Sequence, residues 1–220
     1  MTIVTVVDYG VGNLHSIVRA LRRAGAEVLL TGDQDEVARA ERLLLPGVGA
    51  FGHCAANLRA AGMLEPIHAF VTTGRPFLSI CVGMQLLFEQ SSEFGAHEGL
   101  ALIPGSVDMI PAMHGDSVRK VPHSGWGALQ FSPGRPTWAG TPLGSLRPGF
   151  SSAYFVHSYA ARPTDPAHRL ADVDYQGFNV CAAVQRDNIL GFQFHPETSG
   201  AVGLSVLEAF VSSTPAKILF

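Results

Sequence analysis

The fold is decided by the stretch PFLSICVGMQLLFE, residues 76–89. An apolar run ends at Cys81, a glycine follows two residues later, and an amphipathic helix is expected to begin there. A cysteine at such a strand–turn–helix junction occupies a nucleophile elbow, in which a sharp turn holds the side chain at the carboxyl edge of a sheet. The helix start favours a thiolate, and its N–H groups can bind an oxyanion. The stretch therefore predicts a nucleophilic cysteine on an α/β sheet.

A thiol nucleophile needs a base, and the segment GFQFHPE, residues 191–197, can supply one. His195 can accept the thiol proton, and Glu197 can orient the imidazole ring. Pro196 ends the preceding strand in any case, so the segment alone is also consistent with a surface turn. Paired with the Cys81 junction, it predicts a catalytic triad of Cys81, His195 and Glu197.

Strand-like and helix-like patterns alternate through the first half of the chain. Continuous apolar runs predict buried strands, and apolar residues spaced every three or four positions predict helices. The predicted strands cover residues 2–7, 27–30, 42–45 and the run before Cys81. One predicted helix begins after Asn13, which is expected to cap it, and two more cover residues 54–61 and 64–72. This alternation predicts an α/β fold with a doubly wound, mainly parallel central sheet and helices on both faces.

The second half changes to shorter strands. They are predicted over residues 154–159, 169–175, 179–185 and 189–194, with a tight turn at 186–188 between the last two. We expect an antiparallel C-terminal strand section, followed by a helix over residues 201–211. The tail after about residue 211 has no assigned role, and residues 1–220 are expected to form a single domain.

The composition excludes several classes of function. A net charge of −3 gives no electrostatic basis for binding nucleic acid, and no apolar run reaches the length of a membrane span. The N-terminal residues 1–8 predict a first strand rather than a signal peptide. Three cysteines, Cys54, Cys81 and Cys181, lack the spacing of a metal site. Reduced thiols in a cytoplasmic enzyme are the better interpretation.

Other residues with reactive side chains have simpler interpretations. Cys54 lies in a predicted helix and Cys181 in a predicted strand, so both are expected to be structural. His123 and His157 have no carboxylate nearby in the sequence and are also interpreted as structural. The segment PGVG, residues 46–49, is too short for a phosphate-binding loop. Its two glycines allow close backbone approach or rotation of a peptide plane, which favours an oxyanion-binding strand.

Five runs occur in order along the chain: DYGVGNL (8–14), LPGVGAFG (45–52), CVGMQLL (81–87), VPHSGW (121–126) and YFVHSY (154–159). Together with HPE at 195–197, they resemble the class I (triad) glutamine amidotransferases. Within that family the chain is similar to the glutaminase subunits of imidazole glycerol phosphate synthases. The resemblance covers nearly the whole chain, from residue 8 to residue 199.

The resemblance implies hydrolysis of glutamine to glutamate and ammonia. Cys81 would form a γ-glutamyl thioester, His195 would carry the proton, and Glu197 would orient His195. The implied oxyanion hole consists of the backbone of Val48, Gly49 and Val82. The implied substrate-binding residues are Gln85, Glu93, Ser158 and Tyr159.

The resemblance also implies a heterodimer with a cyclase subunit, a (β/α)8 barrel that receives the ammonia through an internal tunnel. The cyclase would make imidazole glycerol phosphate and an aminoimidazole carboxamide ribonucleotide in histidine biosynthesis. Tyr9, Asn13 and Trp126 are the residues expected to face this partner. The resemblance implies neither a metal nor a cofactor.

The chain departs from the family pattern at two positions and at its end. Ser79 replaces a usual glycine two residues before the nucleophile, Thr198 replaces a usual lysine, and residues 211–220 extend past the usual end. Three alternatives stay open. They are a glutaminase subunit for aminodeoxychorismate or pyridoxal phosphate synthesis, a non-catalytic scaffold, and a γ-glutamyl hydrolase that needs no partner.

Overall fold

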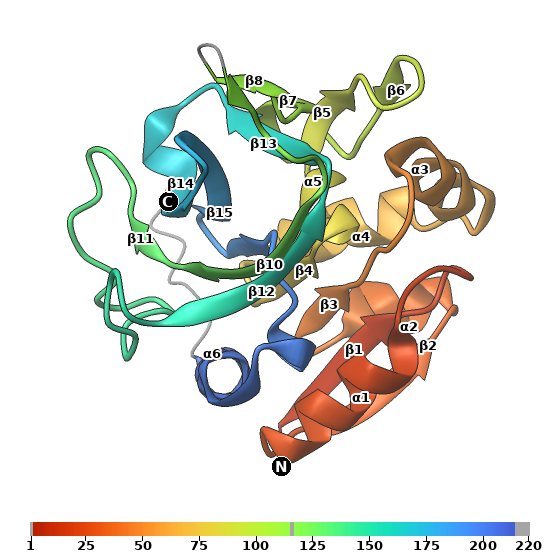
Figure 1. The fold of residues 1–220 in the computed structure, drawn as a ribbon. Coiled ribbons are helices and arrows are strands. Elements are labelled where there is room, and N and C mark those ends of the chain that lie inside the picture. The colour runs from red at the N-terminus through yellow and green to blue at the C-terminus, as the bar shows by residue number, and fades with distance from the viewer. Residues whose placement is uncertain (1, 115–116, 214–220) are drawn as a thin grey trace.

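A computed structural model describes residues 2–114 and 117–213, and an eight-stranded sheet forms its centre (Figure 1). The strand order is β11-β14-β15-β16-β4-β3-β1-β2. The strands are β1 Ile3–Val7, β2 Glu27–Thr31, β3 Leu43–Leu45, β4 Phe77–Ile80, β11 Gln130–Phe131, β14 Arg169–Tyr175, β15 Phe178–Arg186 and β16 Ile189–Phe192. Pairing is parallel from β2 across to β16 and antiparallel from β16 to β11. The predicted parallel sheet with an antiparallel C-terminal section is confirmed.

The parallel strands are buried on both faces. All residues of β3, β4 and β16 are buried, and in β1 only Ile3 is exposed. Because successive side chains of a strand point to opposite faces, continuous burial means that both faces are covered. The helices are α1 Leu14–Arg23, α2 Gln34–Arg39, α3 Phe51–Ala60, α4 Leu64–Val71 and α6 Gly200–Ser212; α1 contacts α6, and α2 contacts α4. Across the described ranges, no helix is long and apolar enough to span a membrane.

Two features near the N-terminus differ from the sequence prediction. Asn13 occupies the N-cap position of α1, but its side chain makes no capping hydrogen bond. The helix is instead fixed by its buried face, which includes Ile17 and Leu21. Helix α2 was not predicted, because six residues are too few for a clear apolar period. It is nucleated by Asp33, whose carboxylate accepts the N–H of Glu36 at 2.9 Å.

The amphipathic helix expected after Cys81 is only four residues long, α5 Val82–Gln85. Its length is limited by partners that are distant in sequence. The carbonyl of Leu86 accepts the N–H of Leu100 at 2.7 Å, and the carbonyl of Leu87 accepts two further N–H groups. These bonds direct the chain into β5 Phe88–Ser91 instead of a longer helix. The helix-dipole argument for the thiol is therefore weaker than predicted, since the dipole of one turn is small.

A second sheet and a two-stranded ribbon complete the fold. The sheet has the order β13-β7-β5-β6, with β13 Tyr159–Pro163, β7 Ile103–Met109 and β6 His97–Glu98; the ribbon pairs β10 His123–Ala128 with β12 Ser152–His157. Minor elements are β8 Met113–His114, β9 Ser117–Val118, and the 3-10 turns η1 Pro166–His168 and η2 Pro196–Thr198. The single strand predicted over 154–159 is wrong. It is divided at Ser158, whose carbonyl accepts the N–H of Ile110 at 2.8 Å and leads the chain into the second sheet.

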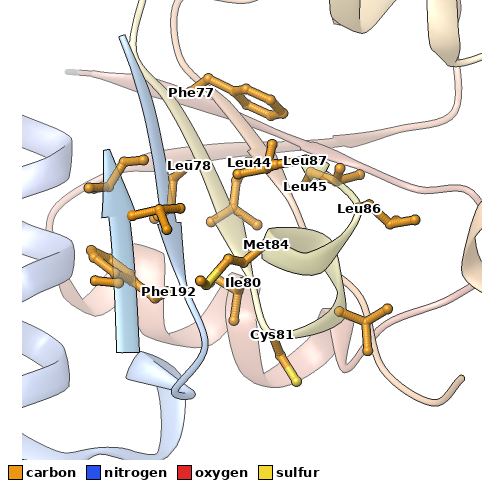
Figure 2. Close-up of a cluster of buried hydrophobic side chains, with 14 of the residues drawn as sticks. Leu44, Leu45, Phe77, Leu78, Ile80, Cys81, Met84, Leu86, Leu87 and Phe192 are labelled. Carbon is orange, nitrogen blue, oxygen red and sulfur yellow. The ribbon is translucent and has the colours of Figure 1, made fainter. Parts of the chain in front are cut away.

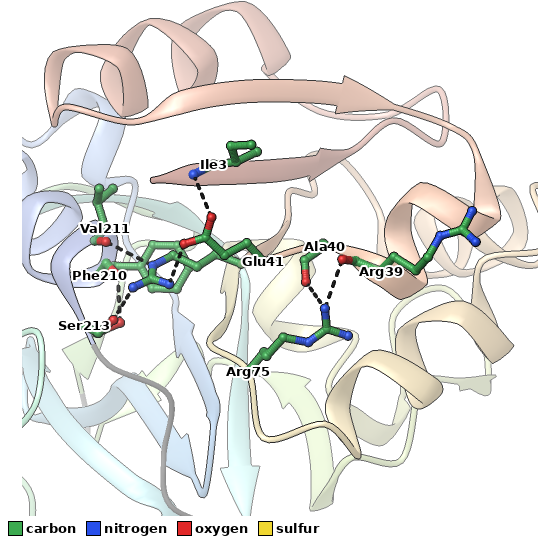
Figure 3. A network of polar contacts seen from close by, with 9 residues as sticks. Ile3, Arg39, Ala40, Glu41, Arg75, Phe210, Val211 and Ser213 are labelled. Carbon is green, nitrogen blue, oxygen red and sulfur yellow. Dashed lines mark hydrogen bonds and ion pairs between the residues drawn. The ribbon is translucent and has the colours of Figure 1, made fainter. Parts of the chain in front are cut away.

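A buried arginine binds the end of the C-terminal helix, and Figure 3 shows two of the residues involved, Val211 and Ser213. Arg42 precedes β3, and its guanidinium donates to the carbonyls of Val211, at 3.0 Å, and Ser213. These carbonyls belong to the last turn of α6, where no intrahelical donor is left for them. Arg75 similarly donates to the carbonyls of Arg39 and Ala40 near the end of α2. Of the C-terminal extension, residues 211–213 are therefore part of α6 and its cap, and residues 214–220 lie outside the described ranges.

Replacing Arg42 by methionine should lower the free energy of unfolding by about 2–3 kcal/mol, because a charge-assisted donor to two carbonyls is lost. Arg39→Met is the matched control. The Arg39 side chain is exposed and, among the described residues, pairs only with exposed Asp35, so its loss should change stability by about 0.5 kcal/mol or less. Urea unfolding measures both. Equal effects of the two substitutions would show that Arg42 does not fasten the helix.

Candidate active site

One cleft of about 370 Å³ brings together most of the predicted site residues. It is lined by Val48, Gly49, Cys81, Val82, Gln85, Glu93, Pro122, Val156, His157, Ser158, Tyr159 and His195. These residues come from the carboxyl edge of the central sheet, from the second sheet and from the β10–β12 ribbon. The cleft therefore lies where ligands bind in open α/β sheets.

Cys81 stands on a strained turn at the end of β4 (Figure 2). Its backbone has φ 55° and ψ −115°, a conformation that side chains other than glycine rarely adopt. The turn is held because the Cys81 N–H donates to the carbonyl of Phe192 at 2.7 Å, and because Ile80, Met84 and Phe192 pack around it. Strain of this kind is concentrated at functional sites, where the surrounding structure maintains it. The geometry is that of a nucleophile elbow.

His195 and Glu197 form a buried pair directly beside the elbow. The Nδ1 of His195 lies 2.8 Å from the Oε1 of Glu197, and the Glu197 side chain is 1% exposed. Burial lowers the pKa of His195, but hydrogen bonds to Cys81 and to Glu197 outweigh it and raise the pKa to about 10. The imidazole is thus suited to hold a proton between a sulfur and a carboxylate.

Main-chain bonds fix the orientation of His195. Its N–H donates to the carbonyl of Tyr154 at 3.0 Å, and its carbonyl accepts the Ser199 hydroxyl at 2.6 Å. The same hydroxyl accepts the N–H of Tyr154 at 2.9 Å. Ser199 therefore links the turn that carries the base to the ribbon. Thr198, which replaces the family's usual lysine, is exposed and donates to the His195 carbonyl at 3.2 Å.

The predicted oxyanion hole is closed in this conformation. The N–H of Val82, one predicted donor, is bonded to the carbonyl of Gly47 at 3.3 Å. The two backbones meet at glycines, and a Cβ on Gly47 would lie 2.4 Å from the nitrogen of Gly83. Val48 and Gly49 continue along the wall of the cleft. An oxyanion can use the Val82 N–H only after the Gly47 carbonyl has moved away.

The predicted substrate-binding residues Gln85, Glu93, Ser158 and Tyr159 line the same cleft. Both hydrogens of the Gln85 amide nitrogen are used, by the carbonyl of Tyr159 at 3.1 Å and by Gln193 at 3.0 Å. Only the amide oxygen of Gln85 is left for a ligand. Glu93 accepts the N–H of Phe51 at 2.6 Å through one oxygen and retains the other. The carboxylate gives the cleft a negatively charged end.

Sequence reasoning missed Gln193, which is completely buried two residues before His195. Its oxygen accepts from Gln85, and its nitrogen lies 3.8 Å from the Cys81 sulfur, within reach of a weak hydrogen bond. A polar residue in an otherwise apolar strand just before the base was the available signal. Gln193 connects the nucleophile to Gln85 in the lining of the cleft.

His123 and His157 form a second buried pair, and His157 lines the cleft. His157 Nδ1 lies 2.7 Å from the carbonyl of Tyr159, so this nitrogen must carry the hydrogen. Its Nε2 then accepts from Nδ1 of His123 at 3.2 Å. The His123 ring stacks on Tyr175. Burial lowers the pKa of His123 to about 4 and that of His157 to about 3, so both rings are neutral at physiological pH.

The three residues predicted to face a partner differ in exposure. Trp126 is 60% exposed on the outer face of the ribbon, and Asn13 is exposed at the start of α1. Tyr9 is only 5% exposed, and its hydroxyl donates to the carbonyl of Pro46 at 2.7 Å. The Tyr9 side chain is thus buried against the PGVG segment, and its contact with a partner stays a prediction.

Ser79 is accommodated inside the sheet two residues before the nucleophile. It pairs with Leu45 of β3 on one side and with Gly191 of β16 on the other, and its side chain is completely buried. Its hydroxyl is buried and has no hydrogen-bond partner among the described residues. Residues 2–114 and 117–213 also contain no cluster of three His, Cys, Asp or Glu side chains that could hold a metal ion.

Comparison with known proteins gives consistent relatives. The family profile described as glutamine amidotransferase class-I matches residues 5–213. The chain is 46% identical to "Imidazole glycerol phosphate synthase subunit HisH 1" of Legionella pneumophila strain Paris, over 96% of this chain and 99% of that protein. It is 45% identical to subunit HisH of Geobacter sulfurreducens, over 96% and 98% of the two chains.

Solved structures agree on the fold. The structure of PurLQS from Thermotoga maritima matches with a TM-score of 0.69 at 18% identity, covering 96% of this chain and 98% of that chain. A crystal structure of a glutamine amidotransferase matches with a TM-score of 0.68, also at 18% identity, covering 94% and 97%. These likenesses establish the α/β architecture.

The lowered pKa values of the histidine pair predict that stability is sensitive to acid. Between pH 6.5, the ordinary value, and pH 4, the unfolded chain binds protons that the folded chain excludes. The contribution of this pair to the free energy of unfolding should therefore be fully present above pH 6.5 and fall as the pH decreases towards 4. Urea titrations across this range measure the slope. His123→Phe should reduce this slope by the equivalent of about one proton, because a phenylalanine ring can still stack on Tyr175 but does not titrate.

His15→Phe is the control for this slope, because His15 is exposed on α1. An equal reduction in both variants would contradict a special contribution from the buried pair.

Proposed function

The chain belongs to the class I glutamine amidotransferase family, and from this membership we propose that it is the glutaminase subunit of an imidazole glycerol phosphate synthase. It hydrolyses glutamine and delivers ammonia to a partner subunit in histidine biosynthesis. The observation that carries the proposal is the meeting of Cys81, His195 and Glu197 at one cleft, in a chain 44–46% identical to subunits of that name. We further propose that residues 1–220 form one glutaminase domain.

The proposed chemistry is acyl transfer to the thiol. The Cys81 sulfur adds to the side-chain amide carbon of glutamine, and His195 takes the thiol proton. His195 then gives this proton to the departing nitrogen, so that ammonia leaves and a γ-glutamyl thioester remains. Water, deprotonated by His195, adds to the thioester and releases glutamate and the free thiol. Glu197 stabilises the charged imidazole in each step.

The zwitterionic end of glutamine would be held at the far end of the cleft. The free oxygen of Glu93 would bind the α-ammonium group, and the amide oxygen of Gln85 would accept another of its hydrogens. Ser158 and Tyr159 would contact this end through their backbone, and the Tyr159 carbonyl already holds Gln85 in place. These contacts would place the side-chain amide of the substrate over Cys81.

Turnover requires the Gly47 carbonyl to leave the N–H of Val82. Rotation of the Gly47–Val48 peptide would free the Val82 N–H and turn the Val48 N–H towards the same point, with Gly47 providing the backbone freedom on one side of this peptide. Two donors would then face the developing oxyanion. A protein with this closed arrangement would hydrolyse glutamine slowly until something favours the rotated peptide. This observation argues against the alternative of a partner-independent γ-glutamyl hydrolase.

The partner we propose is a cyclase with a (β/α)8 barrel, which would take up ammonia by direct channelling and complete a lyase reaction. Trp126 provides an exposed aromatic side chain on the ribbon beside the cleft, the kind of residue that anchors protein interfaces. Asn13 would contribute at the start of α1. Three free thiols, all buried, support a location in the reducing cytoplasm.

Cys81→Ala should abolish release of glutamate from glutamine, since no other group can form the thioester. The complex with the cyclase should still use added ammonium salts, because that chemistry belongs to the partner. Cys181→Ala, a truncation of another buried thiol, is the control and should retain turnover. Glutamate release by Cys81→Ala at the wild-type rate would refute the assignment. His195→Asn should also lose turnover by orders of magnitude, whereas Glu197→Gln, which keeps the geometry, should be milder.

The isolated chain should hydrolyse glutamine slowly, and the cyclase with its nucleotide substrate should raise kcat by about 10³-fold, equivalent to about 4 kcal/mol. The reason is that the Val82 N–H is occupied in the free subunit. Coupled assays of glutamate formation, with and without the partner, measure the factor. A free subunit that already works at the full rate of the complex would refute the closed oxyanion hole and favour an independent hydrolase.

A further inference from the structure

Three consecutive carbonyls of the PGVG segment are held by three different donors. The carbonyl of Pro46 accepts the Tyr9 hydroxyl at 2.7 Å, and the carbonyl of Gly47 accepts the Val82 N–H at 3.3 Å. The carbonyl of Val48 accepts the thiol of Cys54 at 3.3 Å. The two outer donors are side chains, whereas the middle one is the donor that an oxyanion would need.

Only the middle peptide has to turn to open the oxyanion hole. Opposite rotations about the two single bonds that flank a planar peptide turn that peptide and leave its neighbours in place. The carbonyls of Pro46 and Val48 belong to those neighbouring peptides, and neither is bonded to the nucleophile turn. Their donors can therefore remain bonded in both the closed and the open arrangement.

The geometry points to Tyr9 and Cys54 as positioning residues that fix the peptides on either side of the Gly47–Val48 peptide, so that only this peptide turns when the oxyanion hole opens. The inference rests on the proposed glutaminase function and adds two residues to its machinery. Cys54 was expected to fill the core, and Tyr9 was expected at the surface. In the structure both are buried and directed at the same short segment.

Both side chains are buried and keep their hydrogens at neutral pH. Cys54 is fully buried in α3, whose first residue, Phe51, donates its N–H to Glu93 at the cleft. Burial raises the pKa of the Cys54 thiol to about 11 and raises the pKa of the Tyr9 hydroxyl as well. Each group therefore stays a donor at neutral pH. Loss of either donor would let a neighbouring peptide turn too, and the N–H groups would then be aimed less accurately at the oxyanion.

The test uses the full chain in complex with its cyclase, with glutamate formation as the assay. Cys54→Ala should lower kcat about fivefold, the rate equivalent of one neutral hydrogen bond, and leave the KM for glutamine unchanged. Cys54→Ser restores a donor and should return kcat to within about twofold of wild type. Tyr9→Phe removes only the hydroxyl and should also lower kcat about fivefold. Cys181→Ala, the same truncation in a buried strand, should leave kcat unchanged.

The outcomes separate a positioning role from a structural one. A kcat for Cys54→Ala and Tyr9→Phe equal to wild type would overturn the inference, as would a Cys54→Ser variant no faster than Cys54→Ala. A loss of kcat in Cys181→Ala equal to that in Cys54→Ala would also overturn it, because general destabilisation would then explain both. If Tyr9→Phe does not fold, the comparison of Cys54→Ala with Cys54→Ser decides the question alone. A wild-type complex without glutaminase activity would refute the proposed function itself.

Discussion

The backbone of the PGVG segment touches the backbone of the nucleophile turn, and the site is built around this contact. A Cβ on Gly47 would lie 2.4 Å from the nitrogen of Gly83, and a Cβ on Gly83 would lie 2.3 Å from the carbonyl of Leu45. No other residue fits at either position. The close approach lets the Gly47 carbonyl reach the Val82 N–H, so the proposed oxyanion donor and the group that occupies it are part of the same contact. Cys81 adopts a strained backbone conformation at this contact, and the surrounding structure maintains it.

A series of buried polar groups connects the His123–His157 pair to the nucleophile through hydrogen bonds. It runs from His123 through His157 to the Tyr159 carbonyl, and from there through Gln85 and Gln193 to the Cys81 sulfur. Each link fixes the donor and acceptor roles of the next one, since a carbonyl only accepts and both histidines are neutral. Buried networks of this kind specify one arrangement, because any rotated member leaves another group unsatisfied.

The parallel strands and the Cys81, His195 and Glu197 constellation could be predicted from the sequence because each depends on a local pattern, whereas the substrate-binding residues came from the family resemblance. Fully apolar runs identify strands buried on both faces, and the Cys81 junction and the HPE turn mark the ends of such strands. Long-range hydrogen bonds were not predictable in this way. The length of α5 depends on Leu100, the break at Ser158 depends on Ile110, and the burial of Tyr9 depends on Pro46. In each case the deciding partner is far away in the sequence.

The proposed oxyanion hole lies close to a loop through which the proposed partner would act on it. The loop that carries Tyr9 and leads to the exposed Asn13 packs against the PGVG segment, and a Cβ on Gly12 would lie 3.2 Å from the Pro46 side chain. A partner that contacts this loop would act on the Pro46–Gly47 peptide, which directly precedes the Gly47–Val48 peptide that must rotate. Coupling between sites needs a two-state element that both sites influence, and here one peptide bond can serve as that element. A long pathway through the core is not required, because the loop lies in space directly beside Pro46, the residue that precedes the Gly47–Val48 peptide.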